Sequence, residues 1–278
     1  MPGRPTPRST GNAPALIAVA HGSRDPRSAA TMHAVVEQIA AARPDLDVRL
    51  AFLDLSAPSV DQVVDAVAAE GHSHAVVVPL LLGSAFHARV DLPGLLDAAR
   101  ARHPRLRMTQ ADVLGADARL IGALRDRVRS AHVDEPAILH GLIAPTSCSG
   151  GGAPDAASGP YPSLGVAVAA VGSSSVAANA RTAEVARRLA ALTGWKTEIC
   201  FATTEPTVTE AVTRLRARGA EEVLVAPWFL APGLLTDRLI AAAPDVVHAE
   251  VLGPHPALTD IALNRYHAAI GSPLSLSA

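Results

Sequence analysis

The stretch HAVVVPLLL (residues 74–82) is apolar along almost its whole length. A strand with one face in solvent would alternate apolar and polar residues, and this stretch does not. Continuous apolar runs are typical of parallel strands that helices cover on both faces. The run LIAVA (residues 16–20) has the same character. Both runs therefore predict strands of a parallel sheet.

Short apolar runs alternate with longer helix-like segments along the chain. The expected strands lie at 15–20, 47–53, 75–82, 106–113, 165–171, 196–202, 222–230 and 246–252. The expected helices of the first half lie at about 27–42, 58–70, 92–102 and 117–131. Ser56 and Pro58 mark the start of the second helix, and Asp91 and Pro93 that of the third. This alternation implies right-handed βαβ units and a doubly wound α/β fold.

The two halves of the chain resemble each other in four blocks that occur in the same order. HGSRDPRSAA at His21 matches VGSSSVAANA at Val171, and APSVDQVVDAV matches EPTVTEAVTRL. VVVPLLLG matches VLVAPWFLA, and VLGADARLIGALRDR matches VLGPHPALTDIALNR. An internal duplication explains this order. We expect two similar flavodoxin-like α/β domains, each a four-stranded parallel sheet flanked by helices.

Composition divides the chain further. Residues 1–14 are rich in proline and arginine and predict a disordered leader, and the Gly-, Ser- and Pro-rich residues 133–163 predict a flexible linker. The two domains are then expected at 15–132 and 164–271.

The charge balance and the cysteines exclude several classes of protein. The chain has 278 residues, with 24 Lys and Arg against 26 Asp and Glu, so it carries no electrostatic footprint for nucleic acid or an anionic membrane. Cys148 and Cys200 are too few and too far apart for a disulfide framework. No signal peptide or apolar run of about 20 residues is present. We expect a cytoplasmic protein.

Three polar residues follow expected strands of the first half. His21 follows LIAVA, Asp54 follows VRLAFL, and His87 lies just past VVVPLLLGSAF. Because ligands of open parallel sheets bind beyond the carboxyl ends of the strands, these residues are expected at one rim. Two imidazoles and a carboxylate suit borderline divalent metals such as iron, cobalt, nickel or zinc.

Each of these residues also has a simpler interpretation. A single histidine at a strand end is often only a solvated polar residue, and Asp54 equally suits a turn or a helix cap. The duplication bears on this choice, since Val171 replaces His21 and Leu235 falls opposite His87 in the second half. The fold therefore does not need the two histidines. His72 and His74, at the opposite rim, are interpreted as turn residues, with adventitious metal binding by HSH as the alternative.

The segments VAHGSRDP, AFLDLSAPSV and PLLLGSAFHARVDLP resemble the motifs of the sirohydrochlorin chelatase family, the class II tetrapyrrole chelatases. The resemblance covers residues 15 to 270 and implies a lyase that inserts Fe2+ or Co2+ (Ni2+ in vitro) into sirohydrochlorin, for sirohaem or cobalamin. It implies that His21 and His87 bind the incoming metal and assist its insertion. The family often has glutamate where this chain has Asp54.

The implied reaction needs a metal held over the ring and a group that accepts the pyrrole N–H protons. A neutral imidazole can do both near pH 7, so we expect His21 and His87 to be catalytic and Asp54 to complete the metal site. The carboxylates of the tetrapyrrole need donors, for which Ser23, Arg24, Ser84 and Arg89 are the candidates. Each arginine alone is also explained as a solvated surface residue. We expect no organic cofactor and a monomeric protein.

Two other functions use the same residues. One is a carrier that binds the metal or the tetrapyrrole without catalysis, since binding and insertion share ligands. The other is phosphoryl transfer with His21 as nucleophile, because HGSR loosely resembles histidine phosphatases. Those enzymes place an arginine directly before the histidine, where this chain has Ala20.

Overall fold

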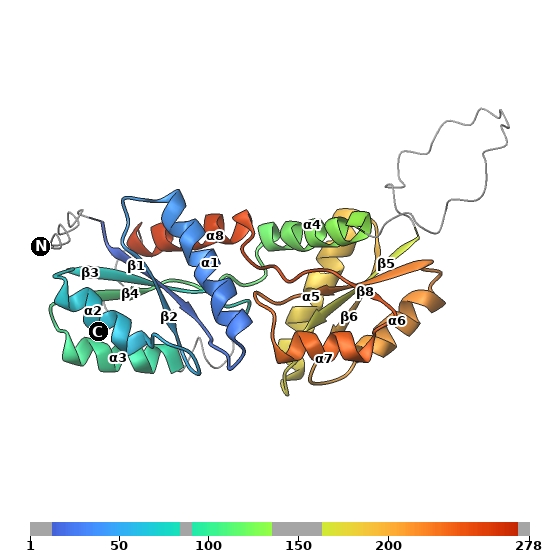
Figure 1. The fold of residues 1–278 in the computed structure, drawn as a ribbon, viewed down its shortest axis with the longest axis horizontal. Helices are drawn as coiled ribbons and strands as arrows, with labels where there is room; N and C mark the ends of the chain where they lie inside the picture. The colour runs from blue at the N-terminus through green and yellow to red at the C-terminus, as the bar shows by residue number, and fades with distance from the viewer. Residues whose placement is uncertain (1–12, 84–90, 135–162, 272–278) are drawn as a thin grey trace, which may run out of the picture. The chain divides into compact units, whose positions relative to one another are not determined.

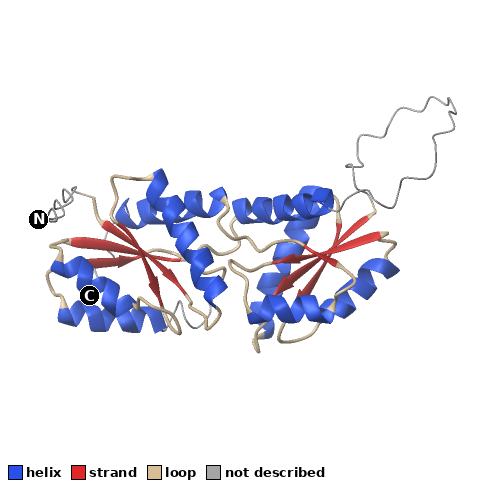
Figure 2. Cartoon of the chain, in the orientation of Figure 1, coloured by secondary structure: helices blue, strands red, loops and turns tan. Residues whose placement is uncertain are grey.

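The computed structural model describes residues 13–83, 91–134 and 163–271. They form two four-stranded parallel sheets with helices on both faces (Figures 1 and 2). Residues 1–12 of the expected leader and 135–162 of the expected linker lie outside the described residues. The expected fold class, two similar parallel α/β domains, is confirmed.

The first sheet has the strand order β2-β1-β3-β4. Its strands are β1 (Ala15–Ala20), β2 (Val48–Phe52), β3 (His74–Pro79) and β4 (Arg107–Gln110). Every residue of β1 is buried, as its continuous apolar run predicted. The chain runs from β1 to one neighbour, β2, and then crosses to the other side of β1 to form β3. The strand order therefore reverses at β1, which is where such sheets bind ligands.

The second sheet repeats this topology in the order β6-β5-β7-β8. Its strands are β5 (Leu164–Ala170), β6 (Lys196–Phe201), β7 (Glu222–Pro227) and β8 (Val247–His248). The repeated order confirms the internal duplication. The last strand of each sheet is shorter than the expected 106–113 and 246–252. These strands lie at a sheet edge with one neighbour each, and their apolar sequence continues into the following loop.

Three helices of each half flank their own sheet. These helices are α1 (Pro26–Ala42), α2 (Val60–Ala69), α3 (Leu92–Arg102), α5 (Val176–Thr193), α6 (Val208–Ala217) and α7 (Leu234–Ala242). α2 begins after Ser59, whose side chain forms a capping box with Gln62, and not at the expected Pro58. Thr207 and Glu210 form the same box at α6. Asp91 precedes α3 without a side-chain capping hydrogen bond.

The fourth helix of each half packs in the other unit. The chain divides into one compact unit of residues up to Asp117 and from Gly253 onward, and a second of Ala118–Leu252. Helix α4 (Ala118–Asp134) therefore packs on α5 and β7, and α8 (Pro256–Gly271) on α1 and β3 (Figure 1). The expected boundaries, 15–132 and 164–271, do not include this exchange. The sequences of the two helices match, so each presents a similar apolar face to a similar sheet.

Matching arginines hold the exchanged helices. The Arg265 guanidinium donates to the carbonyl oxygens of Val113 and Leu114, at 3.0 and 3.4 Å, in the loop after β4. Arg127 donates to the carbonyl oxygen of Leu252, at 3.1 Å, in the loop after β8.

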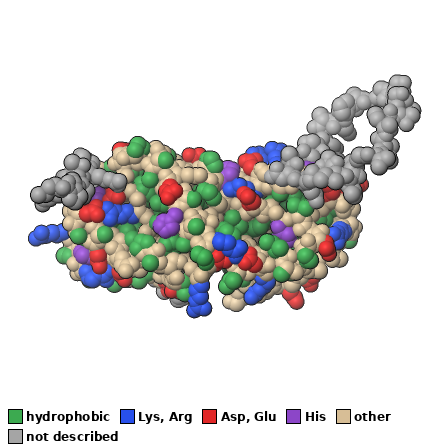
Figure 3. Space-filling view, viewed as in Figure 1, with side chains coloured by type: hydrophobic (Ala, Val, Ile, Leu, Met, Phe, Trp, Pro, Cys, Tyr) green, Lys and Arg blue, Asp and Glu red, His purple; other side chains and the backbone are tan. Residues whose placement is uncertain are grey.

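None of the described helices is long and apolar enough to cross a membrane. On the face shown in Figure 3, acidic and basic side chains are interspersed, and no patch of one sign forms.

Candidate functional site

The loops after β1 and β2 join directly at the carboxyl rim of the first sheet. The Leu53 amide donates to the Ala20 carbonyl at 2.9 Å, and the Asp54 amide to the His21 carbonyl at 3.0 Å. These bonds continue the parallel ladder one residue past each strand. The structure thus places His21 and Asp54 side by side along the backbone, and both residues are exposed.

Two residues beyond His21 and Asp54, Ser23 and Ser56 join the same two loops by a pair of hydrogen bonds. The Ser23 amide donates to Ser56 Oγ at 3.0 Å, and Ser56 Oγ donates back to the Ser23 carbonyl at 2.9 Å. Ser23 Oγ in turn accepts from the Asp25 amide at 3.0 Å. Because the Ser56 hydroxyl both accepts from and donates to the backbone of Ser23, the loop that carries His21 has little freedom to move away from the loop that carries Asp54.

Gly22 makes this close approach possible. Its φ is +97°, and a Cβ atom built on it would lie 1.7 Å from the carbonyl oxygen of Asp54. The left-handed backbone and the contact both require glycine, so the G of HGSR sets the spacing of the two loops.

Asp25 ends the loop by capping α1. Its Oδ1 accepts from the Arg27 amide at 2.9 Å, and the Arg27 guanidinium also donates to the carboxylate. The side-chain hydrogen bond from Arg27 is the main reason why the pKa of Asp25 lies below its usual value. The loop from His21 to Asp25 is therefore fixed at both ends, and Arg24 lies exposed within it.

Asp54 acts as a turn residue and also presents a carboxylate to solvent. Its Oδ1 accepts from the Leu55 amide at 2.7 Å, and Leu55 adopts a φ of +59°. The turn interpretation made from the sequence is thus realised. The residue is exposed, so the turn bond and a role at the rim are compatible.

The second unit builds the same rim without these side chains. The Ala202 and Thr203 amides donate to the carbonyls of Ala170 and Val171 at 2.8 and 3.1 Å, as their counterparts do in the first unit. Gly172 again has a positive φ, of +92°. Val171, in the place of His21, is 45% exposed. A loop with the same backbone bonds therefore forms with neither the imidazole nor the carboxylate, so the fold does not require either side chain.

The remaining expected site residues, His87, Ser84 and Arg89, lie outside the described residues. Leu235, which falls opposite His87 in the sequence match, lies in the first turn of α7.

At the opposite rim, His72 lies beside two carboxylates that the sequence did not single out. Asp47, Glu70 and His72 bring three ligand atoms within 4.8 Å of one another. His74 is separate from this group, since its Nε2 lies 2.9 Å from Thr109 Oγ1. The interpretation of His72 as a turn residue accounts for its place in the chain but not for these neighbours. Glu70 and His72 are neighbours in the sequence, but Asp47 precedes them by more than twenty residues, so only the fold brings its carboxylate to them.

These features define a duplicated parallel α/β protein in which one copy carries a histidine and a carboxylate at the strand ends. The CbiX family model matches residues 15–131 and 165–269, so it covers both copies. The chain belongs to the CbiX family.

Curated relatives carry two related names. The sirohydrochlorin cobaltochelatase of Priestia megaterium is 28% identical over 232 residues, which is 81% of this chain and 66% of the relative. The sirohydrochlorin ferrochelatase of the same organism is 25% identical over 259 residues, covering 89% of this chain and 87% of the relative. The chain thus spans about two thirds of the first relative and most of the second.

Solved structures share the fold. SirB from Bacillus subtilis with Fe3+ matches with a TM-score of 0.71 at 23% identity, over 93% of this chain and 96% of that one. CbiX described as the terminal enzyme of sirohaem biosynthesis in denitrifying bacteria matches with a TM-score of 0.63 at 20% identity, over 92% and 99%. The expected family is confirmed.

Proposed function

We propose that this chain is a chelatase that inserts Fe2+ or Co2+ into sirohydrochlorin, with the chemistry carried out by the first unit. The observation that carries the proposal is the exposed His21, fixed on a locked loop where the duplicate has Val171. Relatives named for insertion of either metal into sirohydrochlorin support the substrate.

Metal insertion forms bonds from the metal to the ring nitrogens and releases the two pyrrole N–H protons. A neutral imidazole holds a borderline divalent metal through a ring nitrogen and accepts a proton near pH 7. In this proposal His21 and His87 first hold the metal. As the tetrapyrrole nitrogens replace the two imidazoles on the metal, the freed imidazoles accept the two pyrrole protons. Asp54 adds negative charge beside His21, which favours the metal cation.

The substrate needs a second set of contacts. Its peripheral carboxylates would accept hydrogen bonds from Ser23, Arg24, Ser84 and Arg89, of which the arginines also supply charge. The Oγ of Ser23 already accepts from the Asp25 amide, so its hydroxyl proton is left to donate. Arg24 is exposed on the same loop.

The relatives leave two metals open, because one name specifies cobalt and the other iron. Both are borderline divalent ions that imidazole and carboxylate bind well, and affinity alone does not select between them. We infer only that the metal is one of these two.

The test is a spectroscopic insertion assay. Full-length protein is mixed anaerobically with sirohydrochlorin and Fe2+ or Co2+, and the absorption change of the macrocycle is followed against a protein-free control. A chelatase accelerates the change over many turnovers at substoichiometric protein. A carrier would bind one equivalent without accelerating it, and a phosphoryl-transfer enzyme would instead hydrolyse p-nitrophenyl phosphate. Either result would overturn the proposal.

A further inference from the structure

Asp47, Glu70 and His72 meet at the amino-end rim of the first sheet, opposite the rim described above. Asp47 directly precedes β2, Glu70 caps the carboxyl end of α2, and His72 lies in the turn that leads to β3. One ligand atom from each lies within 4.8 Å of the other two. We propose that these three residues form a second binding site for a borderline divalent cation such as Co2+ or Zn2+.

The spacing of two of these atoms already suits a metal. His72 Nε2 lies 3.0 Å from Asp47 Oδ2. Two ligands that each lie about 2.0–2.2 Å from one metal ion are themselves roughly 3 Å apart or slightly more. A cation therefore fits between them with only small side-chain movements. Glu70 is 55% exposed at its side chain, so it can rotate to provide the third ligand.

Arg49 occupies the same corner as the three proposed ligands. Its Nε donates to both carboxylate oxygens of Asp47, at 3.1 and 3.0 Å, and its guanidinium also pairs with Glu70. A carboxylate oxygen has two lone pairs, so Asp47 can keep a bond to Arg49 while it binds a metal. The contact between Arg49 and Glu70 is the one that must be given up. An exposed ion pair of this kind contributes little to stability.

The second unit shows that the fold does not need these ligands. The duplication places Lys196, Arg218 and Ala220 where the first unit has Asp47, Glu70 and His72. Glu198 takes the place of Arg49 and pairs with Arg218 at 2.6 Å, so this ion pair persists with its charges exchanged. The contact between Asp47 and His72 has no equivalent. All three proposed ligands are thus replaced by residues that cannot bind a cation or bind it poorly.

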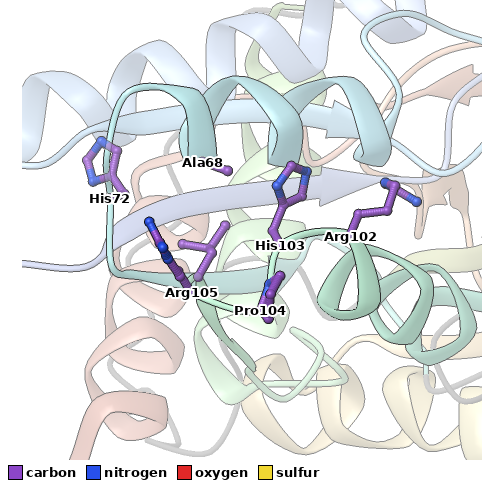
Figure 4. Close-up of a pocket in the computed structure, with 7 residues that line it drawn as sticks. Ala68, His72, Arg102, His103, Pro104 and Arg105 are labelled. Atoms are coloured by element: carbon purple, nitrogen blue, oxygen red, sulfur yellow. The ribbon is translucent and has the colours of Figure 1, made fainter.

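A cavity lies beside His72. It measures about 250 Å³, and His72, Arg102, His103 and Arg105 contribute to its lining. Figure 4 shows His72 and Arg105 at one end of it and Arg102 at the other. Arg102 and His103 pair with Asp61 and Asp65 at 2.5 and 2.6 Å, away from the three ligands. Of the three proposed ligands, His72 alone lines this cavity.

The proposed site is separate from the chemistry of the other rim. A strand of six residues spans roughly 20 Å, so a metal at His72 cannot pass directly to His21. A cation bound here would tie the start of β2, the end of α2 and the approach to β3. Its direct effect is therefore to stabilise the first unit, and the gain in unfolding free energy rises with the logarithm of the metal concentration above the dissociation constant. This inference does not depend on the proposed function.

The experiment uses full-length protein with His21→Ala and His87→Ala, so that metal binding at the proposed insertion site does not contribute to the signal. Titration with Co2+ is followed by calorimetry and by the visible absorption of bound cobalt. One equivalent should bind, and adding His72→Ala should reduce the affinity at least tenfold. Alanine is the residue of the second unit, so this variant is expected to fold, which circular dichroism checks. His103→Ala, on the same cavity, is the matched control and should bind normally.

Arg49→Gln provides the opposite test, because it removes a positive charge next to the metal. It should tighten Co2+ binding several-fold. The proposal is overturned if the background protein binds no Co2+, if His72→Ala leaves the affinity unchanged, or if Arg49→Gln weakens it. None of these results bears on insertion activity, which the spectroscopic assay measures separately.

Discussion

The backbone of Gly22 lies directly against the carbonyl oxygen of Asp54, so that a Cβ atom on Gly22 would fall 1.7 Å from that oxygen. This contact sets how closely the loop that bears His21 approaches the loop that bears Asp54. Gly172 holds the equivalent place in the second unit, where a Cβ atom would meet Thr203 Oγ1 and Thr204 Cγ2, both at 2.9 Å. The first contact involves rigid backbone and the second involves side chains.

Gly22→Ala should therefore cost more than Gly172→Ala. Both variants strain a left-handed backbone, which costs roughly 1–3 kcal/mol, but only Gly22→Ala must also push two loops apart. We expect Gly22→Ala to lose more unfolding free energy than Gly172→Ala, as measured by urea unfolding. Only Gly22→Ala should also lose metal insertion. Equal effects of the two variants on insertion would show that the spacing of His21 and Asp54 is unimportant.

His21→Ala should lower the insertion rate by roughly 10²–10⁴-fold, the usual contribution of a general acid or base. His87→Ala should do the same in this proposal. The fold should survive, since Val171 stands in the place of His21 in the second unit. Val171→Ala is the matched control, and His72→Ala, at the opposite rim, should also leave the insertion rate unchanged. Near-normal rates for both histidine variants would mean that the site is elsewhere.

Two substitutions separate the turn role of Asp54 from its charge. Asp54→Asn keeps an oxygen that can accept from the Leu55 amide, whereas Asp54→Ala loses this bond as well. We expect Asp54→Asn to keep the melting temperature and to lose roughly 10–100-fold in metal affinity or insertion. Asp54→Ala should lower the melting temperature and also weaken metal affinity or insertion. If Asp54→Asn inserts metal normally, the carboxylate has only the turn role.

The two capping boxes should contribute equally to stability. Ser59→Ala and Thr207→Ala each remove the acceptor of a helix N-terminal amide, and each should cost about 1 kcal/mol. Ser59→Gly should cost only a few tenths of a kcal/mol. Chemical denaturation measures all three. A loss for one box alone would show that the duplicated caps are not energetically equivalent.

Cys200 should be inert in the folded protein. Burial raises the pKa of its thiol to about 12, so it stays protonated at neutral pH. In a Cys148→Ser background, a thiol reagent at pH 8 should react with Cys200 only after denaturation. The unfolded thiol ionises near pH 8.5, so its contribution to stability is complete below that pH and is lost progressively as the pH rises toward 12. Fast labelling of the native protein would contradict this.

Much of the architecture follows from local sequence. The apolar runs in β1 and β3 predicted parallel strands buried on both faces, because apolar side chains occupy both faces of each strand. The blocks that start at His21 and Val171 predicted the duplication, and strand ends predicted that His21 and Asp54 share a rim. Helix starts were less certain: Ser59, and not Ser56 or Pro58, caps α2. Capping depends on backbone angles that several nearby serines and prolines suit equally.

The sequence by itself determined the class of fold, the number of copies and which copy carries the imidazole and the carboxylate, since these depend on residue types and their order. Tertiary structure alone decided that α4 and α8 exchange units, because two helices with matching apolar faces fit either sheet. It also decided that Asp47, Glu70 and His72 meet, and that Gly22 packs on Asp54. Contacts of this kind join segments far apart in the chain, and their distances depend on how the whole sheet and its helices pack.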